Sequence, residues 1–240
     1  MSTAASPRDR LIVALDLPSA PAALDLVARL DGRCRWFKVG LELYLAAGAG
    51  IVHTLREQGF QVFLDLKLHD IPNTVAAAVR SVSSTGATLL TVHAAGGEAM
   101  LAAAAEAAAA LAHPPRLLAV TVLTSMNSAQ LQGIGVPDQP ATQVLRLARL
   151  ARTAGISGLV CSPEEIALLR RELGDDPVLV VPGIRPIGAA QGDQQRIATP
   201  AAAIADGASM LVVGRPITQA LDPAGAVEAI LEQMAAPHSS

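Results

Sequence analysis

Four charged residues lie at or near the ends of three short apolar segments in the first third of the chain: Asp16, Lys38, Asp65 and Lys67. If the segments are strands, side chains alternate between two faces, so Asp65 and Lys67 share one face and the leucines between them share the other. Three neighbouring strands would then bring together two carboxylates and two ammonium groups. Burying four charges is costly, and apolar packing is often at least as stable. The cluster therefore indicates function: it could keep a lysine protonated and set a carboxylate against a substrate anion.

Elements that could position this cluster recur along the whole chain. Short apolar, β-branched runs lie at 11–16, 36–40, 62–67, 88–93, 117–123, 158–162, 178–183 and 210–215. Stretches with helical spacing of Leu and Ala separate them, at 19–30, 41–58, 97–112, 141–153, 163–173 and 223–235. Eight strand–helix units of about thirty residues each predict an α/β protein with a single (β/α)8 barrel, the TIM barrel. A doubly wound open sheet is the competing interpretation, and the lack of GxGxxG after the first strand counts against it.

No linker divides the chain, so we expect one domain over residues 1–240, with 1–9 and 236–240 as flexible tails. Active sites of such barrels lie at the carboxyl ends of the strands, with phosphate sites after the seventh and eighth strands. Arg185 follows the seventh apolar run, and Gly214 and Arg215 close the eighth. Glycine lets backbone N–H groups approach a phosphate closely, and arginine adds charge-assisted bonds. This end of the chain therefore predicts a phosphate site.

The composition of the chain excludes several classes of binding partner. The formal charge is −3, from 18 basic and 21 acidic residues, and aromatic residues make up 2% of the chain. Basic stripes and stacking faces for nucleic acid are both missing, so we expect no nucleic-acid partner. Two cysteines and unpaired histidines predict neither a disulfide framework nor a metal site. We also expect no membrane partner and a cytoplasmic location, because the first ten residues lack an apolar signal segment and the Ala-rich stretch 101–112 is too short to span a bilayer.

A family resemblance rests on these same residues. The string DLKLHDIPNT at 65–74 closely resembles the D-x-K-x-x-D-I-P-N-T signature of the orotidine 5′-phosphate decarboxylase family, in its bacterial type. The similarity continues over nearly the whole chain, in ALD (14–16), FKVG (37–40), VHAAG (92–96), TVLTS (121–125), PGIRP (182–186), GDQQR (192–196) and VGRP (213–216). Metal-dependent barrels that share D-x-K-x-x-D, the 3-keto-gulonate-phosphate decarboxylases and hexulose-phosphate synthases, carry an acidic metal ligand where this chain has Lys38.

The resemblance implies a ribulose-phosphate-binding type of barrel that converts orotidine 5′-phosphate to UMP and CO2 in pyrimidine synthesis, with no cofactor and no metal. It assigns Lys67 as the proton donor to C6 and places Asp65 beside the scissile carboxylate. Asp16 and Lys38 would bind the ribose hydroxyls and complete the charge network.

The resemblance also implies a homodimer with a shared active site, in which Asp70 and Thr74 cross the interface to the other subunit's site. Asn73 or Thr74 could in addition cap the helix that follows. Thr124 and Ser125 match the segment that meets the pyrimidine. Gln194 would reach the phosphate from a lid formed by the Gly- and Gln-rich segment 186–196.

Two other functions stay open at this point. One is a metal-dependent sugar-phosphate decarboxylase or aldolase on the same barrel, which predicts a carboxylate at position 38. The other is a non-catalytic barrel that binds a phosphate ligand, which would keep Arg185 and Gly214 but not the charged cluster. Lys38 disfavours the first, and the intact cluster disfavours the second.

Overall fold

Eight parallel strands close into a barrel in the computed structural model, which describes residues 6–187 and 196–236. Each strand pairs with its neighbours in chain order, and the last pairs with the first, so the (β/α)8 fold is confirmed. The strands are β1 (Leu11–Ala14), β2 (Trp36–Gly40), β3 (Gln61–Leu68), β4 (Leu89–His93), β5 (Arg116–Val120), β6 (Gly158–Val160), β7 (Val178–Val181) and β8 (Met210–Val213).

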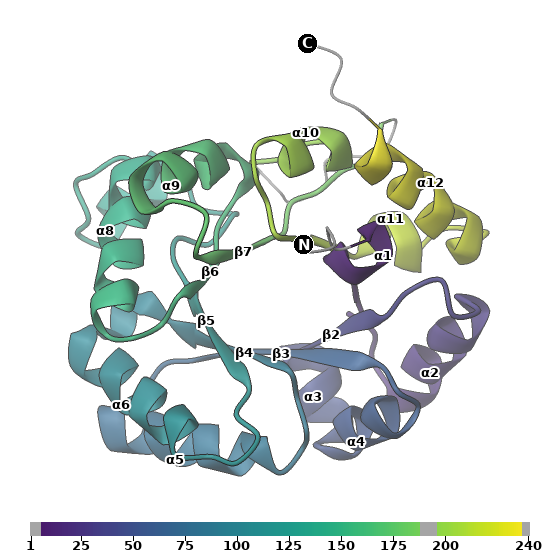
Figure 1. The fold of residues 1–240 in the computed structure, drawn as a ribbon, viewed down its shortest axis with the longest axis horizontal. Coiled ribbons are helices and arrows are strands. Elements are labelled where there is room, and N and C mark those ends of the chain that lie inside the picture. Colours follow the sequence, from purple (N-terminus) through teal and green to yellow (C-terminus); the bar gives the residue numbers. More distant parts are fainter. Residues whose placement is uncertain (1–5, 188–195, 237–240) are drawn as a thin grey trace, which may run out of the picture.

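Helices form a ring outside the strands (Figure 1). The long ones are α2 (Ala20–Arg29), α4 (Gly50–Glu57), α5 (Pro72–Ser83), α6 (Glu98–Ala109), α8 (Pro140–Thr153), α9 (Ile166–Leu173) and α12 (Pro223–Ala235). Shorter ones are α1 (Pro7–Arg10), α3 (Leu41–Ala47), α7 (Ser128–Gly133), α10 (Pro200–Ala205), α11 (Arg215–Thr218) and the 3-10 turns η1 (Ala94–Gly96) and η2 (Pro163–Glu165). Among the described helices, none combines the length and the apolar character needed to cross a bilayer.

Two apolar layers explain why the strands are apolar at nearly every position. One residue in two faces the helices, and the other side chains fill the barrel interior. The interior cluster consists of Ile12, Ala14, Phe63, Leu89, Leu118, Val180, Met210 and Val212. Ile12 and Ala14, two residues apart on β1, both lie in this cluster, as strand alternation requires. The interior is packed with side chains, so a ligand has room only at the barrel's ends.

Several strands end two or three residues earlier than the sequence predicts. The first strand stops at Ala14, the fifth at Val120 and the seventh at Val181. The residues beyond these points leave the hydrogen-bonded ladder and form the loops at the carboxyl end of the barrel. The helix expected over 41–58 is divided into α3 and α4, because Gly48 adopts a left-handed φ of 64° that ends α3. At the amino terminus, α1 lies largely within the segment expected to be a tail.

A close approach between β5 and β6 generates a stability prediction. A Cβ at Gly158 would lie 2.6 Å from the backbone oxygen of Leu117 and 2.5 Å from a methyl carbon of Leu118. We expect Gly158→Ala to lower the free energy of unfolding by about 1–3 kcal/mol, because backbone must shift to accept the methyl group. Urea denaturation measures this. Gly50→Ala is the matched control, since that site at the start of α4 has no atom within 4 Å. Equal midpoints for the two variants would contradict the prediction.

Candidate active site

A cavity of about 570 Å³ opens at the carboxyl ends of the strands. Its volume lies within the range of small-ligand sites. The residues that line it include eight that the sequence analysis had selected: Asp16, Lys38, Asp65, Lys67, Thr124, Arg185, Gly214 and Arg215. They come from β1, β2, β3, β5, β7 and β8 or from the loops directly after them. The structure therefore brings most of the candidate residues into one place.

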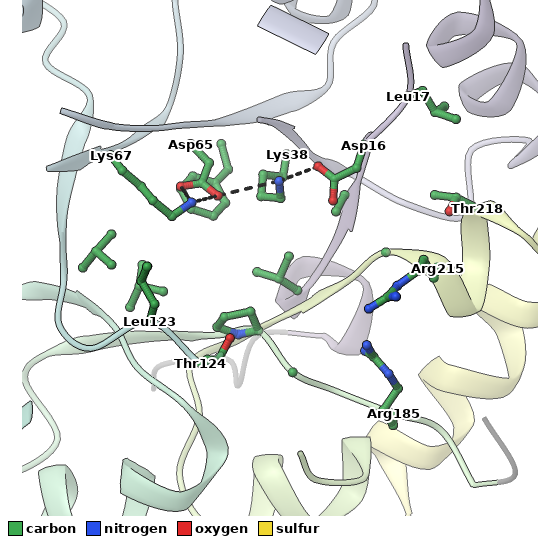
Figure 2. A pocket seen from close by; sticks show the side chains of 18 of the residues that line it. Asp16, Leu17, Lys38, Asp65, Lys67, Leu123, Thr124, Arg185, Arg215 and Thr218 are labelled. Carbon is green, nitrogen blue, oxygen red and sulfur yellow. Dashed lines mark hydrogen bonds and ion pairs between the residues drawn. The ribbon is translucent and has the colours of Figure 1, made fainter. Parts of the chain in front are cut away.

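The four charged residues form a continuous row of alternating sign along one wall (Figure 2). The Lys38 ammonium donates to Asp16 Oδ1 at 2.8 Å and lies 3.6 Å from Asp65 Oδ2. The Lys67 ammonium lies 2.9 Å from both oxygens of Asp65. Each inner charge thus has an opposite charge on both sides, which offsets the cost of removing it from water.

Burial differs along this row. The side chains of Lys38 and Asp65 are each 11% exposed, whereas those of Lys67 and Asp16 are 33% and 55% exposed. Gly40, which ends β2, leaves the space for the buried part, since a Cβ there would lie 2.8 Å from Lys38 Nζ. Lys38 and Asp65 therefore form the fixed centre of the row, and Lys67 and Asp16 remain accessible to a ligand.

Lys67 reaches this position through a bulge in β3. Leu64 pairs with Leu90 on β4, but the next pair is Leu68 with Val92. Three residues of β3, 65–67, therefore face a single residue of β4. Lys67 itself has a left-handed φ of 50°, which costs a residue other than glycine about 1–3 kcal/mol. Simple alternation correctly predicted that Asp65 and Lys67 point into the mouth, but it did not predict this backbone distortion, which is a common device beside active sites.

Two arginines lie on the opposite side of the cavity from the charged row. Arg185 follows β7 and is buried, and Arg215 is the first residue of α11, directly after β8. Figure 2 shows both guanidinium groups directed into the same part of the cavity. Thr218, one turn along α11, and Gln219 line this side as well. A ligand that spans the cavity would meet the charged row at one end and two guanidinium groups at the other.

Three of the expected site residues do not line the cavity, and a fourth lies outside the residues that the structure describes. Asp70, Thr74 and Ser125 are exposed at its margin and are not among its lining residues. Gln194 lies outside the described residues, as does most of the segment 186–196 that was interpreted as a lid. The expectation that Asn73 or Thr74 caps the following helix is wrong. Pro72 is already the first residue of α5, so Ile71 is the N-cap residue and makes no side-chain cap hydrogen bond.

A buried group of polar residues that the sequence did not predict lies behind the cavity wall. Arg196 is 5% exposed, makes an ion pair with Glu165 and donates to the backbone oxygen of Leu123 at 2.9 Å. Glu165 also accepts hydrogen bonds from the backbone and hydroxyl of Ser162. Leu123 lines the cavity beside Thr124, so this group holds the loop that follows β5. The S-x-x-E spacing of Ser162 and Glu165 is a capping-box signal that could have identified half of it.

Histidine and cysteine chemistry do not extend the site. His93 stacks on His69 with ring centroids 5.2 Å apart, and its Nδ1 accepts a 3.3 Å hydrogen bond from the backbone of Ala95. Burial, aided by the charges of His69 and Lys67, lowers the pKa of His93 and so favours the neutral form of its ring. Among the residues that the structure describes, no three His, Cys, Asp or Glu side chains gather in a way that could hold a metal ion.

The fold and the cavity define a (β/α)8 barrel of the kind that works on phosphorylated ligands, with a row of alternating charges opposite paired arginines. Comparison with known proteins agrees, because the pattern of the "Orotidine 5'-phosphate decarboxylase / HUMPS family" matches residues 9–230. The chain belongs to this family.

Relatives named orotidine 5′-phosphate decarboxylase match over nearly their whole length. The protein from Halorhodospira halophila is 54% identical over 227 residues, 95% of this chain and 96% of the relative. One from Pseudomonas aeruginosa is 51% identical over 235 residues, 98% and 100% of the two chains. The crystal structure of orotidine 5′-phosphate decarboxylase from Lactobacillus acidophilus superposes with a TM-score of 0.84 at 42% identity, covering 95% of this chain and all of that one.

The two thiols generate a prediction about reactivity. Cys34 and Cys161 are both buried and free, and burial raises the pKa of Cys34 to about 12 and that of Cys161 further still. Because the thiolate is the reactive form, we expect neither to react with a disulfide reagent at pH 8 in the native protein, and both to react in denaturant. Colorimetric thiol titration checks this. Rapid labelling of either thiol in the native protein would contradict it.

Proposed function

We propose that this protein decarboxylates orotidine 5′-phosphate to UMP and CO2 in pyrimidine synthesis, without a metal or an organic cofactor. The observation that carries the proposal is the Asp16–Lys38–Asp65–Lys67 row at the barrel mouth. In the reaction the bond between C6 and the carboxylate carbon breaks, and CO2 leaves. The electron pair stays on C6 in the ring plane, where the π-system cannot delocalise it. The protein must therefore stabilise this carbanion electrostatically.

Lys67 is the proposed proton donor. Its ammonium is held beside Asp65 before the substrate arrives, so positive charge is already in place where negative charge develops on C6. The ammonium then gives its proton to C6 and regains one from solvent. Asp65 positions Lys67 and stands beside the scissile carboxylate, while Asp16 and Lys38 bind the ribose hydroxyls.

The lysine content of the chain supports this role. Of its 18 basic residues only Lys38 and Lys67 are lysines, which leaves 16 arginines by subtraction. Arginine does not give up a proton at neutral pH, whereas an ammonium group can. Both lysines of the chain thus line one cavity, where a compact charge or a transferable proton is needed.

Phosphate recognition is assigned to the other side of the cavity. Arg185 and Arg215 supply charge-assisted hydrogen bonds, and the backbone at Gly214 supplies N–H groups that a phosphate can approach closely. Gln194 is proposed to join them, as the family resemblance implies. Thr124 and Ser125 are assigned to the pyrimidine. Phosphate binding far from C6 then provides binding energy that helps to assemble the reacting groups.

A homodimer with shared sites is the proposed assembly. Asp70 and Thr74 are exposed beside the mouth, and so is Ile71, 67% exposed between them. Leu41 and Leu45, one turn apart on α3, are 51% and 80% exposed after the neighbouring strand β2. A second copy of the chain would cover this apolar surface and receive Asp70 and Thr74 in its own site. The cytoplasmic location expected from the sequence belongs to the same proposal.

A metal-dependent sugar-phosphate reaction is the alternative within the family. The space between the carboxylates of Asp16 and Asp65 is filled by the ammonium of Lys38. A lysine at that place repels a divalent cation, so the site favours the decarboxylation of orotidine 5′-phosphate.

The direct test follows the ultraviolet absorbance of orotidine 5′-phosphate with the purified protein in excess EDTA. We expect the substrate band to disappear as UMP forms. Lys67→Ala and Lys67→Arg should each lower kcat by more than about 10³-fold, because neither side chain can deliver the proton. Arg171→Ala, which removes an exposed cation, is the control that keeps activity. Substantial turnover by Lys67→Ala would remove Lys67 as the proton donor.

The shared site is tested by mixing inactive subunits. Asp70→Ala and Lys38→Ala homodimers are both expected to be inactive. A heterodimer of the two contains one site with both defects and one site with none, so it should show about half the activity of the native dimer. Differently tagged subunits allow the heterodimer to be purified. If verified heterodimers stay inactive, the two residues do not act in one composite site.

A further inference from the structure

Thr91 is the single residue of β4 that faces the three-residue bulge of β3. The pairs on either side of it are Leu64 with Leu90 and Leu68 with Val92. Its side chain is fully buried and does not line the cavity. A threonine at a fully buried strand position needs a partner for its hydroxyl group.

The Thr91 hydroxyl has two partners, and both belong to the charged row. It accepts a 2.8 Å hydrogen bond from the backbone N–H of Lys67 and donates a 3.0 Å hydrogen bond to Asp65 Oδ1. The first bond replaces the ladder contact that the bulge removes, and it holds the backbone where φ is 50°. The second bond fixes the carboxylate oxygen that also accepts from Lys67 Nζ. One hydroxyl thus joins the main chain of Lys67 to the acceptor of its side chain.

We propose that Thr91 is a positioning residue for the Asp65–Lys67 pair. Its hydroxyl holds the backbone of the bulge in its observed conformation. It thereby sets the direction in which the Lys67 ammonium points into the cavity. Because Thr91 does not line the cavity, its effect on catalysis is transmitted through Asp65 and Lys67. Neither the family resemblance nor the motifs in the sequence select this residue.

Alternative roles for Thr91 predict different behaviour. If it only filled space, valine, which has nearly the same shape, would replace it without effect. If its hydroxyl positions the pair, as proposed, serine should replace it and valine should not. The proposal therefore separates Thr91→Val, which removes both hydrogen bonds, from Thr91→Ser, which keeps them. Thr91→Cys, with a weak donor, should fall between the two.

The matched control is Thr85, a second buried threonine with the same bonding pattern. It is 3% exposed, donates to the backbone oxygen of Val82 and accepts from the backbone N–H of Ala87. It lies between α5 and β4, at the barrel end away from the cavity. Thr85→Val loses one donated and one accepted hydrogen bond as well. It therefore measures how much the loss of a buried threonine hydroxyl affects stability and activity when the residue is far from the cavity.

The kinetic experiment rests on the proposed function. We expect Thr91→Val to lower kcat for orotidine 5′-phosphate by about 10- to 100-fold, with KM within about threefold, because a small misplacement of a reacting group costs rate more than binding. Thr91→Ser should stay within about threefold of the native kcat, and Thr85→Val should too. Thermal unfolding of every variant shows whether each is folded at the assay temperature. Native-like kcat in Thr91→Val, or equal loss in Thr91→Ser, would overturn the proposal.

A second readout does not depend on activity. The chain has two lysines, so protein labelled with ¹³C at lysine Cε gives two side-chain NMR signals, and Lys67→Ala identifies the one from Lys67. That signal should move in Thr91→Val and stay in Thr91→Ser and Thr85→Val. An unmoved signal in Thr91→Val would overturn the positioning role. If the native protein fails to decarboxylate the substrate, the proposed function fails, and this signal alone decides the role of Thr91.

Discussion

Two carboxylates and two ammonium groups share the mouth of this barrel, and the two buried ones, Lys38 and Asp65, are tolerable there only because of their neighbours. Lys38 lies between Asp16 and Asp65, and Asp65 lies between Lys38 and Lys67. Removing Lys38 or Asp65 would leave its buried neighbour with one opposite charge in place of two, which is costly for a group removed from water. The parallel barrel meets this requirement because it ends β1, β2 and β3 side by side with their inward faces in common.

The same row connects stability to chemistry. A preorganised ammonium group stabilises a developing anion without waiting for solvent to reorient, since its cost of desolvation was met when the protein folded. The bulge of β3 and the left-handed backbone at Lys67 add a cost in conformational free energy beside these charges. Such distortions persist where the surrounding structure holds them, and here Thr91 supplies the holding contacts. Strained backbone, buried charge and the proposed proton donor therefore coincide.

Behind the opposite wall a different buried pair has a supporting role. Arg196 and Glu165 join the residues from 196 onward to η2 and to the loop after β5. They place Leu123 and Thr124 against the cavity. The ligand site is thus bounded on one side by charges that face the cavity and on another by charges that are hidden from it. Only the charges that face the cavity could be predicted from the sequence, because they follow strand ends. The sequence does not show that Arg196 and Glu165 meet.

The sequence by itself determined the eight-stranded barrel, since apolar strands and helical stretches recur with a regular period. Strands that are apolar on both faces must be buried on both faces, and a barrel surrounded by helices does this. It also determined seven cavity residues, because strand alternation and the rule that sites lie at carboxyl ends can be applied to a sequence, and it determined Thr124 through the family resemblance. Tertiary structure alone decided the bulge, the left-handed φ of Lys67 and the role of Thr91, which depend on register between β3 and β4. It likewise decided the early strand ends and the Arg196–Glu165 pair, whose members are 31 residues apart. Register and contacts between distant segments follow from the packing of the whole barrel, so no local pattern could specify them.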